Sequence, residues 1–282
     1  MSYSFTKLSN AVDQLNRFRS LASSEHHERY LFPYLCGSYF SYRKVDILRI
    51  KTIAEAISSN KQNKQIKYLD IGCGNGDFLE KIREYIPNAK GIENNIELFY
   101  LLACIGRTKP DYIELNDVRY GIDDFYDIIF VGWMDPGQDF RKNIAEKTDI
   151  IITTLDAGLS LAAEYEGYGF NKIVKWITPS WEDVNIEITN HFYSNIDSKT
   201  LDFLSSLRGA HNFWYIYSKD NIKSKLIIDR LKNQTELEGD EYKNIRYDFE
   251  KVLDECGFSI YQRLQNHDKN SDIELWKMEI LE

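Results

Sequence analysis

Short apolar runs alternate with amphipathic runs through the central part of the chain. Apolar residues recur at helical spacing between 45 and 57, and a polar connector follows at 58–65. The chain then contains a series of short apolar runs, each expected to form a strand: 66–71, 89–93, 111–115, 126–132 and 149–155. Amphipathic sequence expected to be helical follows several of them, at 78–86, 96–105 and 139–147. This rhythm predicts an α/β fold with a Rossmann-like, doubly wound, mainly parallel sheet and helices on both faces.

After Asp156 the pattern changes to alternating apolar and polar residues. "KIVKWI" (172–177) and "VNIEITNHFY" (184–193) indicate a hairpin, and "FWYIYS" (213–218) indicates a third antiparallel strand. We therefore expect residues 159–240 to form an inserted α+β segment.

The C-terminal region is expected to return to the main sheet. Charged helical sequence occupies 241–255, and two strand-like runs follow at 257–264 and 273–281 with a polar turn between them. These runs predict a C-terminal antiparallel hairpin.

The composition is that of a folded globular protein, because 43% of the residues are hydrophobic and 28% are charged. No apolar run approaches the roughly 18 residues of a membrane-spanning helix. The first ten residues also lack the apolar core of a secretion signal. The sequence therefore predicts a cytoplasmic protein with no membrane contact.

Charge disfavours nucleic acid as a partner. The 35 basic and 44 acidic residues give a formal net charge of -9, which repels a phosphate backbone at long range. A local groove stays open as an alternative, because lysines lie near aromatic residues that could stack on bases: Lys172, Lys175, Lys219, Lys223 and Lys225 with Trp176, Trp214 and Tyr215.

No metal site is expected. The four cysteines are scattered without C-x-x-C spacing, and the histidines at 26 and 27 have no carboxylate or cysteine at convincing ligand spacing.

Three glycines at alternate positions, in "LDIGCGNGDF" (69–78), directly follow an apolar strand. A strand that turns sharply into a helix beneath a bound ligand needs residues without Cβ, for positive φ and for close backbone approach. Gly72, Gly74 and Gly76 meet this requirement. Their spacing differs from the G-x-G-x-x-G of dinucleotide sites, so a nicotinamide-dependent oxidoreductase is a weaker alternative.

The same stretch resembles the first motif of the class I S-adenosylmethionine-dependent methyltransferases, in which an acidic residue precedes a G-x-G-x-G loop. The resemblance covers about residues 66–156 and returns at the terminal hairpin. It implies that S-adenosyl-L-methionine is the cofactor. By resemblance, Asp70 helps to fix the methionine amino group, and the backbone at Gly72, Gly74 and Gly76 lies along the cofactor.

Further cofactor residues are expected at the ends of the next two strands. Glu93 ends the second predicted strand, where a carboxylate can accept two hydrogen bonds from ribose hydroxyls. Asp117 follows the third strand and matches the family's acidic residue near the adenine amino group, and Val118 would supply a backbone or apolar contact. Carboxylates suit a cofactor that carries a sulfonium and an ammonium group.

The resemblance also suggests a division of the chain. We expect an N-terminal helical cap at 1–60, a cofactor-binding core at 61–158 and an acceptor-recognition or lid segment at 159–240, with 241–282 completing the core.

The acceptor is expected beyond the fourth strand, at "GWMDPGQD" (132–139). This stretch partly resembles the Asp-Pro-Pro-Tyr motif of methyltransferases that act on base or amide nitrogens. However, Gly137 follows Pro136 and no aromatic residue comes next. Asp135 is the candidate catalytic residue, for acceptor orientation or proton removal. The alternative is that Asp135 only begins a turn.

The sequence thus favours a methyltransferase that acts on a small-molecule acceptor. RNA or protein acceptors remain alternatives, as does a non-catalytic scaffold that keeps the methyltransferase fold.

Overall fold

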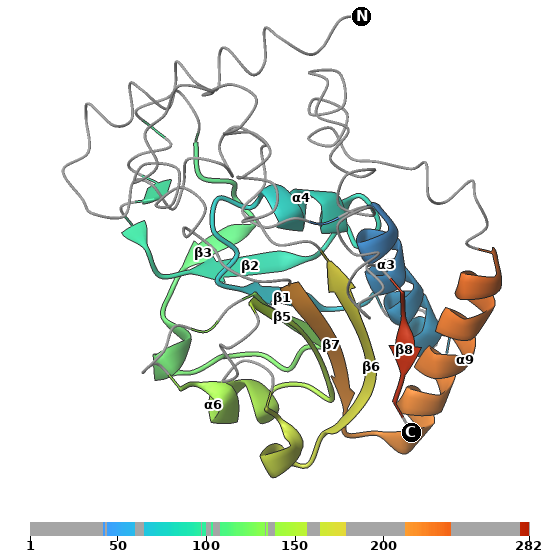
Figure 1. The fold of residues 1–282 in the computed structure, drawn as a ribbon. Helices are drawn as coiled ribbons and strands as arrows, with labels where there is room; N and C mark the ends of the chain where they lie inside the picture. Colours follow the sequence, from blue (N-terminus) through green and yellow to red (C-terminus); the bar gives the residue numbers. More distant parts are fainter. Residues whose placement is uncertain are drawn as a thin grey trace, which may run out of the picture.

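The computed structural model describes residues 42, 44–59, 65–96, 98, 99, 103, 108–132, 134, 139–156, 164–178, 212–237 and 277–281 (Figure 1). The α-helices are α3 (Lys44–Ser58), α4 (Asp77–Arg83), α6 (Arg141–Ala145) and α9 (Asn221–Leu237), and the 3-10 helices are η2 (Val118–Tyr120) and η4 (Glu166–Tyr168). The strands are β1 (Tyr68–Ile71), β2 (Lys90–Glu93), β3 (Ile113–Leu115), β4 (Ile128–Gly132), β5 (Ile150–Asp156), β6 (Asn171–Thr178), β7 (Asn212–Ser218) and β8 (Glu279–Ile280). All five strands predicted between 66 and 155 are present.

The eight strands form one sheet in the order β3-β2-β1-β4-β5-β7-β6-β8. Strands β1 to β5 are parallel, and β7 lies antiparallel between β5 and β6. The chain order reverses at β1, because Ile71 pairs with Ile92 of β2 on one side and with Val131 of β4 on the other. In open α/β sheets, ligands bind outside the carboxyl ends of the strands at such a reversal. The topology therefore predicts a binding site where β1 and β4 end.

Apolar side chains cover both faces of the sheet. On one face α3 packs against α9 and α4, and the cluster beneath them includes Ile50, Phe130 and Ile227. On the other face Ile129 packs with Ile144 of α6. Because successive strand residues point to opposite faces, strands buried on both faces are continuous apolar runs. This explains why these strands were visible in the sequence.

The prediction of an inserted segment at 159–240 was wrong for its two described strands. β6 and β7 pair with each other, and β7 pairs with β5, so both belong to the main sheet (Figure 1). Along β6 and β7 one face is fully buried, at Trp176 and Trp214, whereas Lys175 and Tyr215 on the other face are partly exposed. This one-sided burial produced the alternating pattern that indicated a separate hairpin. Residues 184–193 lie outside the described part of the chain.

The third antiparallel strand predicted at 213–218 is confirmed as β7. Of the predicted C-terminal hairpin, residues 257–264 lie outside the described part, and β8 forms a short antiparallel pair with β6. Helix α9, which follows β7, was not predicted. Among the described helices, none is both long and apolar enough to cross a membrane.

Candidate functional site

The glycine loop lies at the carboxyl end of β1, beside the carboxyl end of β4. Gly72, Gly74 and Gly76 have φ values of 70°, 57° and 89°, in the left-handed region that disfavours residues with a Cβ. A Cβ on Gly72 would lie 3.7 Å from the backbone oxygen of Gly132, so the backbones at the two strand ends are close. The sequence prediction that these glycines form a sharp strand-to-helix turn is confirmed.

The three glycines face different surroundings. A Cβ on Gly76 would lie 2.6 Å from Cδ1 of Ile113, so this position is closed by the neighbouring strand. Among the described residues, and apart from its two chain neighbours, no heavy atom lies within 4 Å of the corresponding point at Gly74. Within the described part of the chain, Gly74 is therefore the loop position at which no neighbouring side chain covers the backbone.

Glu93 lies against this loop. Its Oε2 accepts a hydrogen bond from the Gly74 N–H at 2.9 Å, and its Oε1 accepts from the N–H groups of Asn94 and Asn95, each at 2.9 Å. The residue is only 8% exposed. The sequence placed Glu93 at the cofactor, but the contact with the loop amide depends on side-chain direction and was not predicted.

Asp70 lies just before the loop and is 2% exposed. Burial raises the pKa of its carboxyl well above the ordinary value, and the negative charge of Glu93 raises that pKa further. Among the described residues, the Asp70 carboxyl has no hydrogen-bond partner. The site therefore contains two acidic groups close enough to interact, one of which is costly to ionise without a cation.

Asp117, the third acidic residue expected at the cofactor, forms hydrogen bonds with the nearby Arg119. It caps η2 by accepting a hydrogen bond from the Arg119 N–H at 2.9 Å, and its Oδ1 also accepts from Nε of Arg119 at 2.9 Å. The side-chain hydrogen bond with Arg119 lowers the pKa of Asp117. Val118 is buried among apolar residues. The adenine contacts expected of Asp117 and Val118 stay predictions.

Two glycines of the neighbouring strands were missed in the sequence analysis. A Cβ on Gly91 of β2 would lie 2.5 Å from Sγ of Cys73 and 2.7 Å from Cδ2 of Leu79, so the loop and α4 pack closely over this strand. Gly132 ends β4 beside Gly72. A glycine within an apolar strand could have indicated this packing in the sequence, since such a glycine often marks a place where another backbone or side chain approaches closely.

The acceptor side is described only in part. Asp135, Pro136 and Gly137 lie outside the described residues, and Met134 beside them is buried. The catalytic role of Asp135 therefore stays a prediction.

The two tryptophans considered for stacking on nucleic-acid bases are buried, and three of the lysines considered with them form ion pairs. Trp176 and Trp214 stack on each other with ring centroids 5.1 Å apart and are 1% and 0% exposed, so neither is accessible to a base. Lys172 pairs with Glu166 at 3.4 Å, and Lys175 pairs with Glu279 at 2.8 Å. Lys223 pairs with Asp149. Each of these three lysines therefore has an acidic partner.

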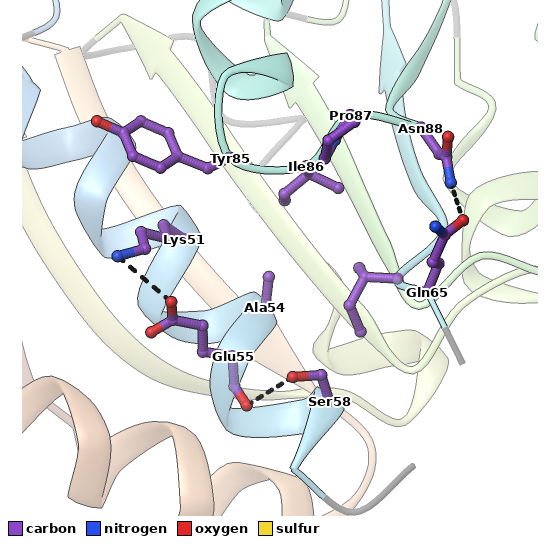
Figure 2. A pocket seen from close by; sticks show the side chains of 10 residues that line it. Lys51, Ala54, Glu55, Ser58, Gln65, Tyr85, Ile86, Pro87 and Asn88 are labelled. Carbon is purple, nitrogen blue, oxygen red and sulfur yellow. Dashed lines mark hydrogen bonds and ion pairs between the residues drawn. The ribbon is translucent and has the colours of Figure 1, made fainter. Parts of the chain in front are cut away.

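A groove of about 210 Å³ lies near the amino ends of β1 and β2, away from the carboxyl ends where the glycine loop lies (Figure 2). It lies between α3, which contributes Lys51 and Glu55, and the turn that contains Tyr85 and Asn88. Because this turn leads into the amino end of β2, the groove is not part of the glycine-loop site. Within the described ranges, no group of histidine, cysteine, aspartate and glutamate side chains is arranged to hold a metal ion.

No protein-family model and no curated protein sequence matches this chain. Among solved structures, it is similar to a ribosomal protein L11 methylase from Lactobacillus delbrueckii subsp. bulgaricus, with 12% identity over 60% of this chain and 78% of that one and a TM-score of 0.35. It is similar to the plantazolicin methyltransferase BpumL in complex with SAH, with 13% identity, coverage of 76% and 98%, and a TM-score of 0.37. A third is a precorrin-6y C5,15-methyltransferase from Geobacter metallireducens, with 13% identity, coverage of 60% and 86%, and a TM-score of 0.36. With identities and TM-scores this low, the similarities carry no argument about function, which rests on the geometry of the site.

Proposed function

We propose that this protein is an S-adenosylmethionine-dependent methyltransferase that acts on a small-molecule acceptor. The observation that carries the proposal is the acidic character of the glycine loop. Buried Asp70 precedes the loop, and the Gly74 amide already donates to the carboxylate of Glu93.

This arrangement suits a cation and opposes a phosphate. A pyrophosphate bound at a glycine loop needs free backbone N–H donors, and one of these donors is occupied by Glu93. A second negative charge at this position would also be repelled by Glu93 and would find no compensation from Asp70. An ammonium or sulfonium group placed near Asp70 would instead favour its ionised form. The site therefore fits S-adenosyl-L-methionine better than a dinucleotide.

The residues divide into those that hold the cofactor and those that place the acceptor. Asp70 would bind the cofactor's ammonium group and Glu93 the ribose hydroxyls. The backbone at Gly72, Gly74 and Gly76 would lie along the cofactor. The cofactor supplies an activated methyl group. The end of β4 would align the acceptor and exclude water, with Asp135 as the candidate that orients it or removes a proton.

A small acceptor is favoured by charge. The net charge is -9, and three lysines that could have formed a basic groove are paired with acidic side chains. Strong salt dependence of binding to an RNA would contradict this choice of acceptor.

The cofactor is tested by calorimetric titration with S-adenosylhomocysteine, with NAD as the comparison ligand. We expect micromolar binding of S-adenosylhomocysteine alone and at least a tenfold loss of affinity in Asp70→Asn, because the neutral amide cannot balance the ammonium charge. Binding of NAD alone would reverse the assignment. Binding of neither would favour the scaffold alternative.

Catalysis is tested with methyl-labelled S-adenosylmethionine and a panel of small-molecule acceptors. We expect Asp135→Ala to lose turnover while its affinity for S-adenosylhomocysteine stays within about threefold of wild type, or roughly 0.7 kcal/mol. Cofactor binding without transfer to any acceptor class would favour the scaffold. Unchanged turnover of Asp135→Ala would remove this residue from the site.

A further inference from the structure

We propose that Glu93 is a positioning residue that holds the glycine loop in its binding conformation before any ligand arrives. The proposal concerns the free protein.

The geometry shows three backbone donors converging on one carboxylate. One oxygen binds the amide of Gly74 in the loop, and the other binds the amides of Asn94 and Asn95, which follow β2. The side chain thus links the end of β2 to the middle of the loop that follows β1. Hydrogen bonds to an ionised acceptor are stronger than those between neutral groups, and burial of Glu93 limits competition from water.

The loop needs such a link at Gly74. At its start, the N–H groups of Gly72 and Cys73 both donate to the backbone oxygen of Ile92, at 2.9 and 3.2 Å. At its end, the Gly76 N–H donates to the oxygen of Cys73 at 3.0 Å. Between these anchors, no atom of the described residues, its two chain neighbours aside, lies within 4 Å of the Cβ position of Gly74, and the Gly74 N–H donates to the Glu93 carboxylate. This hydrogen bond links the middle of the loop to the end of β2.

The test is amide hydrogen exchange followed by NMR in the free protein. We expect Glu93→Gln to accelerate exchange at Gly74 at least about tenfold relative to wild type, while exchange at Leu69 in β1 is unchanged. Glu114→Gln is the matched control, because this exposed carboxylate on β3 accepts from the Asn116 side chain at 3.2 Å and does not contact the loop. The control should leave Gly74 protected.

Glu93→Asp is the second variant. It keeps the negative charge but withdraws the carboxylate by one methylene, so it should also expose the Gly74 amide. Unchanged protection of Gly74 in either folded variant would overturn the proposal, as would an unprotected Gly74 amide in wild type. Loss of the native fold in both variants, with Glu114→Gln folded, would also overturn it, because Glu93 would then support the whole fold.

These outcomes are separable from the cofactor assignment. The exchange experiment contains no ligand, so its result stands even if S-adenosylhomocysteine does not bind. Conversely, native binding together with an unchanged Gly74 exchange rate in Glu93→Gln would contradict the positioning role alone.

Discussion

Asp70 and Glu93 belong to adjacent parallel strands, and the charge of Glu93 adds to burial in raising the pKa of the Asp70 carboxyl. Glu93 is stabilised by three backbone amides, whereas Asp70 has no hydrogen-bond partner among the described residues. The two carboxyl groups therefore have different roles. Glu93 accepts hydrogen bonds from the backbone of the glycine loop and of the residues after β2. Asp70 is a buried acid whose ionised form a cationic ligand would favour.

The raised pKa of Asp70 should make the free energy of unfolding depend on pH. The folded-state pKa of Asp70 is raised, so its contribution to stability is fully present below the unfolded pKa of about 4 and is lost as pH rises through the folded pKa. Asp70→Asn stays neutral and avoids that loss. We expect its Tm to be close to wild type near pH 4 and at least about 3 °C higher at pH 8. Asp123→Asn, at an exposed position, is the control; a Tm difference that does not grow with pH would contradict the prediction.

The open space over Gly74 predicts the effect of a large side chain. Gly74→Arg should abolish binding of S-adenosylhomocysteine in calorimetry while the circular dichroism spectrum stays largely native, because the side chain would extend into space rather than into the core. Gly169→Arg is the matched control. Gly169 also has a positive φ and, among the described residues, no atom but its chain neighbours within 4 Å of its Cβ position, but it lies before β6, away from the glycine loop. If Gly74→Arg still binds the ligand, the loop does not face the cofactor.

Gly91 should be intolerant of even one methyl group. Gly91→Ala would place a Cβ 2.5 Å from Cys73 Sγ and 2.7 Å from Leu79 Cδ2, so the loop or α4 must shift. Overpacking of this kind typically costs about 1–3 kcal/mol in the free energy of unfolding. Urea denaturation should show this loss, together with weaker binding of S-adenosylhomocysteine, because Cys73 is part of the loop.

Gly167→Ala provides the comparison, since among the described residues no atom, its chain neighbours aside, lies within 4 Å of its Cβ position. Equal stability of the two variants would mean that β2 and the glycine loop pack less tightly than the structure shows.

The sequence by itself determined the parallel half of the sheet and the glycine turn. Strands buried on both faces must be apolar throughout, and positive φ at a tight turn requires glycine, so both features are local and visible in the residue order. The candidate roles of Asp70 and Glu93, by contrast, came from the resemblance of the glycine motif to a known family.

Only the tertiary structure decided which distant strands pair and where side chains point. β7 enters the sheet between β5 and β6, although its alternating pattern resembles that of a separate hairpin. Glu93 turns toward the Gly74 amide, and Asp117 toward Arg119. Strand pairing depends on contacts between residues far apart in the chain, and side-chain direction depends on donors that neighbouring elements supply, so neither is fixed by local sequence.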